Sequence, residues 1–149
     1  MEVFRSINAD KIHNIITHPK VLYWLTDDNS TNYEVILHPQ IIYIMNKVET
    51  GMIRVDPFNS ICCSVHIATL PELWGQGQDF AESAIRWGFK NTMFQKIIGM
   101  IPAYNDRVIS LVKRIGFRQE GVLTKSFLKN WKLHDQLIFG LNKGDKSWQ

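Results

Sequence analysis

The segment from Leu70 to Gly88 constrains the fold of this chain more than any other. It reads Leu-Pro-Glu-Leu-Trp-Gly-Gln-Gly-Gln-Asp-Phe-Ala-Glu-Ser-Ala-Ile-Arg-Trp-Gly. An apolar run typical of a buried strand, Ile61 to Leu70, leads into it, and apolar residues at helical spacing follow. The two glycines, Gly75 and Gly77, lie between these patterns. The segment therefore predicts a strand, a glycine turn and the start of a helix.

A turn of this kind is suited to binding an anion. Glycine lets the backbone approach a ligand closely, and the first amides of a helix have no partners within the helix. A diphosphate would fit between Gly75 and the helix start. Glycines between a strand and a helix more commonly serve only to make the turn, so this loop alone leaves both roles open.

A second segment, residues 105–117, predicts a capped amphipathic helix. Asn105 is a suitable cap and Gly116 a suitable end. The apolar residues between them stand at offsets of zero, three, four and seven, which places them on one face. These residues are Val108, Leu111, Val112 and Ile115, and we expect them to be buried against a sheet.

Together the two segments resemble motifs of the GCN5-related N-acetyltransferases (GNAT). That family carries Pro-Glu-x-x-Gly-x-Gly at the same distance before an asparagine-started helix that ends in Gly-Phe. The chain also resembles the branch that acetylates the N-termini of ribosomal proteins. The motifs similar to that branch are Trp-Gly-x-Gly, Gly-Phe-x-x-Glu-Gly and His-Asp. The matching residues are Pro71, Glu72, Trp74, Gly75, Gly77, Asn105, 116–121, His134 and Asp135, and the likeness covers roughly residues 40–142.

The resemblance implies a single α/β domain over residues 1–149, with a mixed, mainly antiparallel sheet and flanking helices. It implies acetyl-coenzyme A as co-substrate and an amine as acceptor, with a protein N-terminus as the specific expectation. The diphosphate would lie on the loop of Trp74, Gly75, Gln76, Gly77, Gln78, Asp79 and Phe80, near Asn105. A bulged amide within Ala68, Thr69 and Leu70 would polarise the thioester. Glu72 or His66 would be the base, although His66 is equally consistent with a strand residue that has no chemical role.

The sequence also departs from the family. Asp79 stands where the loop usually has glycine or alanine, and a carboxylate about 4 Å from a phosphate opposes it by about 1 kcal/mol in water and about 4 kcal/mol at a dielectric of 20. Val112 and Val108 stand where members have tyrosine or serine. The first forty residues match no acceptor-binding pattern.

These departures keep a second function open, a binding or assembly module that retains the fold without the chemistry. A faint whole-chain resemblance to small tailed-phage virion-assembly proteins points the same way. An open cleft beside Gly75 would favour the enzyme, whereas a cleft filled by Trp74, Phe80 or Asp79 would favour assembly.

Composition excludes several other classes. With 45% hydrophobic and 21% charged residues, the chain is typical of a soluble globular protein. A net charge of +3, spread along the sequence, argues against a nucleic-acid binder, and we interpret Lys113, Arg114 and Arg118 as a solvated helix end. No apolar run is long enough to span a membrane and no secretory signal is present, so we expect a cytoplasmic protein. Cys62 and Cys63, adjacent in a strand, should be reduced thiols without a metal.

The remaining pattern predicts the order of elements. A strand at Val3 to Ile7 should lie at a sheet edge, followed by a helix capped by Asn8 and stopped at His18-Pro19. In the short helix Val21 to Leu25, Tyr23 and Trp24 either pack on the sheet, the commoner role, or line the acceptor side. After a polar loop at 27–33, strands are expected at 41–46, 52–55 and 61–70, then at 96–101 parallel to the last of these. Closing strands follow near 117–123 and 134–141, and a frayed tail at 142–149.

Overall fold

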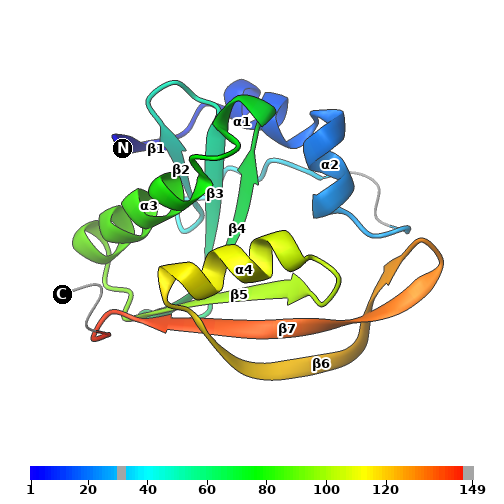
Figure 1. Cartoon of the computed structure of the whole chain (residues 1–149). Helices are drawn as coiled ribbons and strands as arrows, with labels where there is room; N and C mark the ends of the chain where they lie inside the picture. Colours follow the sequence, from blue (N-terminus) through cyan, green and yellow to red (C-terminus); the bar gives the residue numbers. More distant parts are fainter. Residues whose placement is uncertain (30–32, 146–149) are drawn as a thin grey trace.

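The structure is a computed structural model that describes residues 1–29 and 33–145 (Figure 1). Its elements are β1 (Val3–Ser6), α1 (Ala9–Ile16), α2 (Pro19–Leu25), β2 (Ile42–Asn46), β3 (Gly51–Pro57), β4 (Cys62–Thr69), the 3-10 turn η1 (Pro71–Leu73), α3 (Gly77–Asn91), β5 (Lys96–Pro102), α4 (Asp106–Ile115), β6 (Arg118–Lys129) and β7 (Lys132–Asn142). The strands form one sheet in the order β1-β2-β3-β4-β5-β7-β6. Only β4 and β5 pair in parallel among the described strands, so the expected mixed, mainly antiparallel sheet is confirmed.

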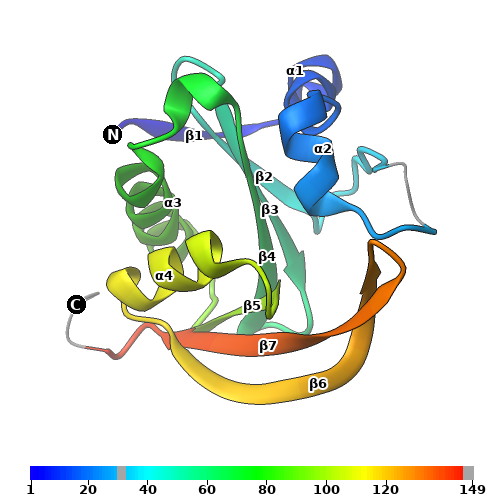
Figure 2. The same ribbon diagram turned by 45° about the vertical axis from the view of Figure 1, so that its right-hand side comes forward.

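Helices cover both faces of the sheet (Figure 2). Alternate residues of the strands point to opposite faces, and each face has its own apolar core. On one face, Phe80 and Phe89 of α3 pack with Ile44 of β2 and Phe139 of β7. On the other, the isoleucines of α1 (Ile12, Ile15 and Ile16) pack with Tyr43, Met45, Met52 and Ala68. The apolar face predicted for the first helix is confirmed by this packing.

The parallel pair β4 and β5 separates soon after it starts. Only Cys62 to Ser64 pairs with Lys96 to Ile98, and the strands then diverge (Figure 1). Beyond that point β4 continues along β3 as far as Thr69, while β5 continues along β7 as far as Pro102. One edge of β4 is therefore left without a strand neighbour within the described part of the chain.

Helix ends follow the predicted caps. The Asn8 side chain accepts a hydrogen bond from the Lys11 amide at 3.2 Å, and that of Asn105 accepts one from the Val108 amide at 3.4 Å. At Gly116, φ is +111°, the left-handed conformation that ends α4. The predicted burial of α4 holds only for Ile115, which is 4% exposed. Its neighbours Val108, Leu111 and Val112 are only partly buried, because α4 lies beside the gap between the diverging strands.

The closing hairpin is longer than predicted. β6 and β7 extend over 118–129 and 132–142, and the residues that the pattern missed lie around a register shift between Leu123 and Phe127. The turn residues Asn130 and Trp131 both have positive φ, at 53° and 59°. The carboxylate of Asp28 accepts hydrogen bonds from both turn amides, at 3.0 and 2.7 Å, and so ties the hairpin to the segment after α2.

Three other predictions meet the structure in part. Cys62 and Cys63 are free thiols, and Cys63 is buried. Within residues 1–29 and 33–145 no helix is long and apolar enough to cross a membrane. The polar loop and the frayed tail extend into residues 30–32 and 146–149, which lie outside the described residues.

Candidate active site

A cleft of about 370 Å³ opens where β4 and β5 diverge. Four segments that are distant in sequence form its walls: α2, the end of β4, the glycine loop with the start of α3, and α4. The lining residues are Lys20, Val21, Trp24, Leu25, Ile67, Ala68, Thr69, Trp74, Gly75, Gly77, Gln78, Asn105, Arg107, Val108, Leu111 and Arg114. The cleft thus brings together the two sequence segments that carried the predicted site.

The glycine loop has the geometry of an anion cradle. Gly75 has φ of +92°, which side chains other than glycine rarely tolerate. A Cβ atom added at Gly77 would meet no protein atom within 4 Å, so this backbone faces open space. The first helical hydrogen bond of α3 runs from the Phe80 amide to the Gln76 carbonyl at 3.1 Å. The three amides before Phe80 therefore precede the helical bonding pattern and can donate to a ligand.

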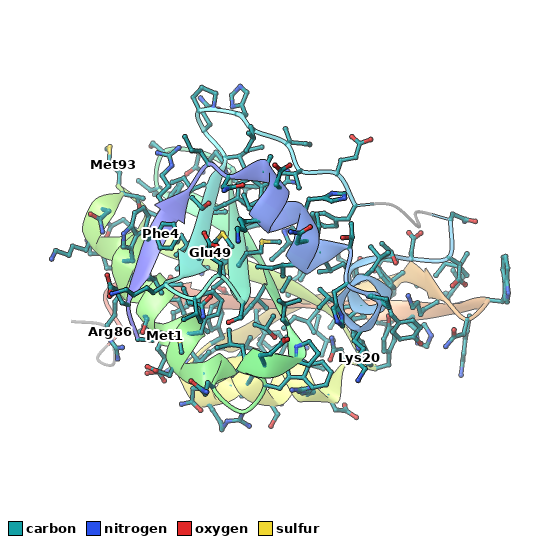
Figure 3. The ribbon with its side chains drawn as sticks, turned by 90° about the horizontal axis from the view of Figure 1, so that it is seen from above. Met1, Phe4, Lys20, Glu49, Arg86 and Met93 are labelled. Carbon is teal, nitrogen blue, oxygen red and sulfur yellow. The ribbon has the colours of Figure 1, made fainter. Side chains whose placement is uncertain are left out.

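Positive charge and an aromatic ring surround this cradle. The Trp74 ring lies 4.7 Å from the guanidinium carbon of Arg107 and 5.9 Å from the ammonium of Lys20, which Figure 3 labels on α2. Arg114 of α4 donates to the Gln78 side chain at 3.3 Å across the cleft. Lys20, Arg107 and Arg114 line the cleft, and no carboxylate is among the described lining residues. This charge suits a polyanionic ligand.

Neither Asp79 nor Phe80 fills the cleft. The Asp79 side chain is 60% exposed, and its Oδ1 lies 3.4 Å from the backbone amine of Met1. Phe80 is fully buried in the core between the sheet and α3. Trp74 forms a wall, where its Nε1 donates to the Thr69 carbonyl at 3.3 Å. The cleft is open, which was the condition set for the enzymatic function.

The end of β4 offers backbone groups to the cleft. The Leu70 amide donates to the Thr50 carbonyl at 2.7 Å, which is toward β3. Because successive backbone groups alternate in direction, Thr69 and Ile67 direct their amides to the opposite side, where β5 has diverged. The predicted bulge is wrong, since the pairing of β3 with β4 runs without a shift through Thr69. An unpaired strand edge takes its place.

The two candidate bases lie outside the cleft lining. Glu72 is exposed on η1. His66 lies on the same face of β4 as Ala68, the face covered by α1 and α2. Its Nδ1 is 3.9 Å from Oδ2 of Asp56, and Arg54 donates hydrogen bonds to both carboxylate oxygens of Asp56. Burial lowers the pKa of His66; Asp56 opposes this shift and Arg54 adds to it. The imidazole is therefore neutral at pH 7 and able to accept a proton.

Other predicted residues divide between the cleft and its supports. Ala68, Thr69, Gly75, Gly77, Gln78 and Asn105 line the cleft, and Asn105 also caps α4. Leu70 packs against the core under α1 and α2 instead. Gln76 is the residue before α3, exposed, and its side chain makes no capping bond.

Sequence reasoning missed several residues of the site. Lys113, Arg114 and Arg118 are exposed, as expected for a solvated helix end, but Arg114 also lines the cleft. Lys20 and Arg107 line it too, although they carried no motif. Trp24 also lines the cleft and is 49% exposed, so packing is not its only role. Its ring centroid lies 6.4 Å from that of Tyr104, whose pKa is raised mainly by burial. Trp24 and Tyr104 lie far apart in the sequence, so no local pattern signals their contact.

Comparisons with known proteins bear on the fold. No protein-family model and no curated protein sequence matches the chain. Among solved structures, the spermidine N-acetyltransferase of Vibrio cholerae in complex with CoA and spermine is 17% identical over 99% of this chain and 98% of that chain, with a TM-score of 0.80. The ribosomal-protein-S5-alanine acetyltransferase of Vibrio fischeri is 20% identical over 75% and 66%, with a TM-score of 0.61. A GNAT-family acetyltransferase of Bacillus anthracis is 18% identical over 71% and 68%, with a TM-score of 0.60. The chain therefore has the fold of the GNAT acetyltransferases.

Proposed function

We propose that this protein is an N-acetyltransferase that moves the acetyl group of acetyl-coenzyme A to an amine. The observation that carries the proposal is the open cleft at the end of β4, where β5 has diverged, with the start of α3 and three cationic side chains on its walls. The diphosphate and the thioester of the co-substrate each have a matching feature there.

The diphosphate is assigned to the start of α3. The amides of Gly77 and Gln78 donate to it, and the helix terminus adds about 0.3 to 1 kcal/mol for an anion. Arg114 and Lys20 supply the opposite charge within the same cleft. Asp79 does not oppose this binding, because its carboxylate is turned toward Met1 and away from the cleft lining.

The thioester is assigned to the free edge of β4. An extended chain with amide groups can pair, as an added strand, with the amides of Ile67 and Thr69, which point away from β3. A backbone amide that donates to the thioester oxygen stabilises the charge that develops there when the amine attacks. The amine nitrogen bonds to the carbonyl carbon, the carbon–sulfur bond breaks, and coenzyme A leaves as a thiolate. Val108 and Val112 provide no hydroxyl group that could protonate the thiolate. The thiolate can leave without such an acid, because a thiol has a pKa near 8.5.

His66 is assigned as the base that takes the proton lost by the attacking amine. It is neutral at pH 7, is 45% exposed in its side chain, and lies two residues before Ala68 on the strand that lines the cleft. The α2 side of the cleft, with Trp24, is assigned to the acceptor. The motifs of Trp74 to Gly77 and Gly116 to Gly121 support a protein N-terminus as the acceptor. A peptide with a free N-terminus and spermidine should both be assayed.

The first experiment measures coenzyme A binding by thermal unfolding. At 100 times its dissociation constant, a ligand stabilises the native state by about 2.7 kcal/mol. For a chain of this size, each kcal/mol raises the midpoint by about 2 to 4 °C, so a shift of several degrees is expected.

Gly77→Asp should reduce the shift, to about two-thirds of its size for a loss of about 1 kcal/mol and to almost nothing for a loss of about 4 kcal/mol. A carboxylate in that open space repels the diphosphate by about 1 to 4 kcal/mol, while no protein atom is displaced. The matched control is Ser83→Asp, which adds the same charge to α3 outside the cleft lining. If the parent protein shows no shift, the proposal is wrong and the assembly role is favoured.

A further inference from the structure

A second, apolar cavity lies between the sheet and the helices α3 and α4. It has a volume of about 70 Å³. Strand residues such as Val65 and Ile97 form its floor, and Ala84 of α3 and Val112 of α4 form its roof. Almost every lining side chain is aliphatic or aromatic, and Cys63 contributes a thiol whose pKa burial raises to about 12. Water therefore finds few hydrogen-bond partners in this space.

The cavity adjoins the cleft. Ile67 of β4 and Leu111 of α4 line both spaces. The Ile67 side chain packs with the core under α3 and α4, on the same face as the cavity. A thioester held by the backbone of Ile67 and Thr69 would thus have its acyl carbon next to the cavity wall.

We propose that the cavity receives the end of an acyl chain longer than acetyl, with butyryl-coenzyme A as the preferred donor. This inference rests on the proposed function of the cleft. The volume of about 70 Å³ is roughly twice the 30 Å³ that a water molecule occupies in the liquid, which is space for about two methylene groups. Filling an empty apolar cavity is favourable because its walls regain contacts and the chain leaves water. The transfer reaction itself is the same, with the butyryl carbon bonded to the amine in place of acetyl.

The test compares dissociation constants of coenzyme A, acetyl-coenzyme A and butyryl-coenzyme A by titration calorimetry. Each buried methylene group strengthens binding by about fourfold, so butyryl-coenzyme A should bind about 15-fold more tightly than acetyl-coenzyme A. Octanoyl-coenzyme A, whose chain exceeds the cavity, should gain nothing over butyryl-coenzyme A.

Ala84→Leu tests whether the cavity is the cause. Ala84 is 2% exposed and lines the cavity but not the cleft, so the larger side chain should fill the space. The dissociation constants of acetyl-coenzyme A and butyryl-coenzyme A should then differ by no more than about twofold. Lys90→Leu, which adds the same side chain on the exposed side of α3, should leave the 15-fold preference unchanged. Val112→Leu, a smaller addition to the roof, replaces Ala84→Leu if that variant does not fold, and it should lower the preference.

The outcomes separate the two proposals. If coenzyme A binds but the acetyl and butyryl thioesters bind equally, the cavity is only a packing space and the proposed function stands. If Ala84→Leu keeps the preference, the chain is bound elsewhere and the inference is also wrong. Failure of all three ligands to bind overturns both proposals.

Discussion

Replacing Lys129 with methionine should loosen α2 from the closing hairpin. The Lys129 side chain is 5% exposed. Its ammonium donates to the carbonyls of Tyr23 and Thr26, the latter at 2.7 Å, and lies 4.0 Å from the centroid of the Tyr23 ring. These carbonyls belong to the C-terminal end of α2, where a cation satisfies groups that the helix leaves free. Because α2 also carries Lys20 and Trp24 of the cleft, Lys129 supports one wall of the candidate site.

The magnitude follows from these contacts. Each hydrogen bond from a charged donor contributes about 1.5 to 3 kcal/mol, so the two together contribute about 3 to 6 kcal/mol. Methionine has a similar length and no buried charge to desolvate, which returns part of this loss. We expect a net loss of about 2 to 4 kcal/mol, or a midpoint lower by about 5 to 15 °C.

Chemical and thermal denaturation measure this change. Lys132→Met is the matched control, because Lys132 pairs with Lys129 across the same hairpin and is exposed. It should cost less than about 0.5 kcal/mol, as is usual for surface substitutions. A Lys129→Met protein as stable as the control would refute the reasoning, since the two carbonyls would then need no cation.

Three further predictions follow from single side chains. Asp79→Asn should change the dissociation constant of coenzyme A by less than about fivefold, because a carboxylate outside the cleft opposes a phosphate by less than about 1 kcal/mol in water. An affinity for coenzyme A that rises about a hundredfold would instead show that the Asp79 charge lies beside the ligand. The pKa of His66 is lowered from 6.5 in the folded state, so the unfolded chain binds more protons and stability falls as the pH drops below about 6.5. His66→Gln should flatten this part of the stability profile, and an unchanged slope would contradict the lowered pKa of the imidazole. Maleimide should label Cys62 and leave Cys63 unlabelled in the folded protein, since Cys63 is 1% exposed and its pKa is raised to about 12; mass spectrometry of the labelled peptides checks this.

Local chemistry allowed much of the fold to be predicted. The caps at Asn8 and Asn105 depend on a side chain and an amide three residues away. The turn at Gly75 depends on a conformation that glycine adopts at little cost. Strand alternation and helical spacing report which face of each element is buried. Each of these signals lies within a few residues, so the sequence alone is sufficient to place it.

Tertiary structure decided the features that make the cleft. The divergence of β4 and β5 appears in no pattern, because both strands read as continuous apolar runs. Lys20, Arg107 and Arg114 converge from α2 and α4 although each, taken alone, is typical of a solvated surface charge. The direction of the Asp79 carboxylate depends on where the distant N-terminal strand lies. Local sequence sets the shape and polarity of each element, whereas the site depends on distances between elements, and those are fixed only when the two cores pack.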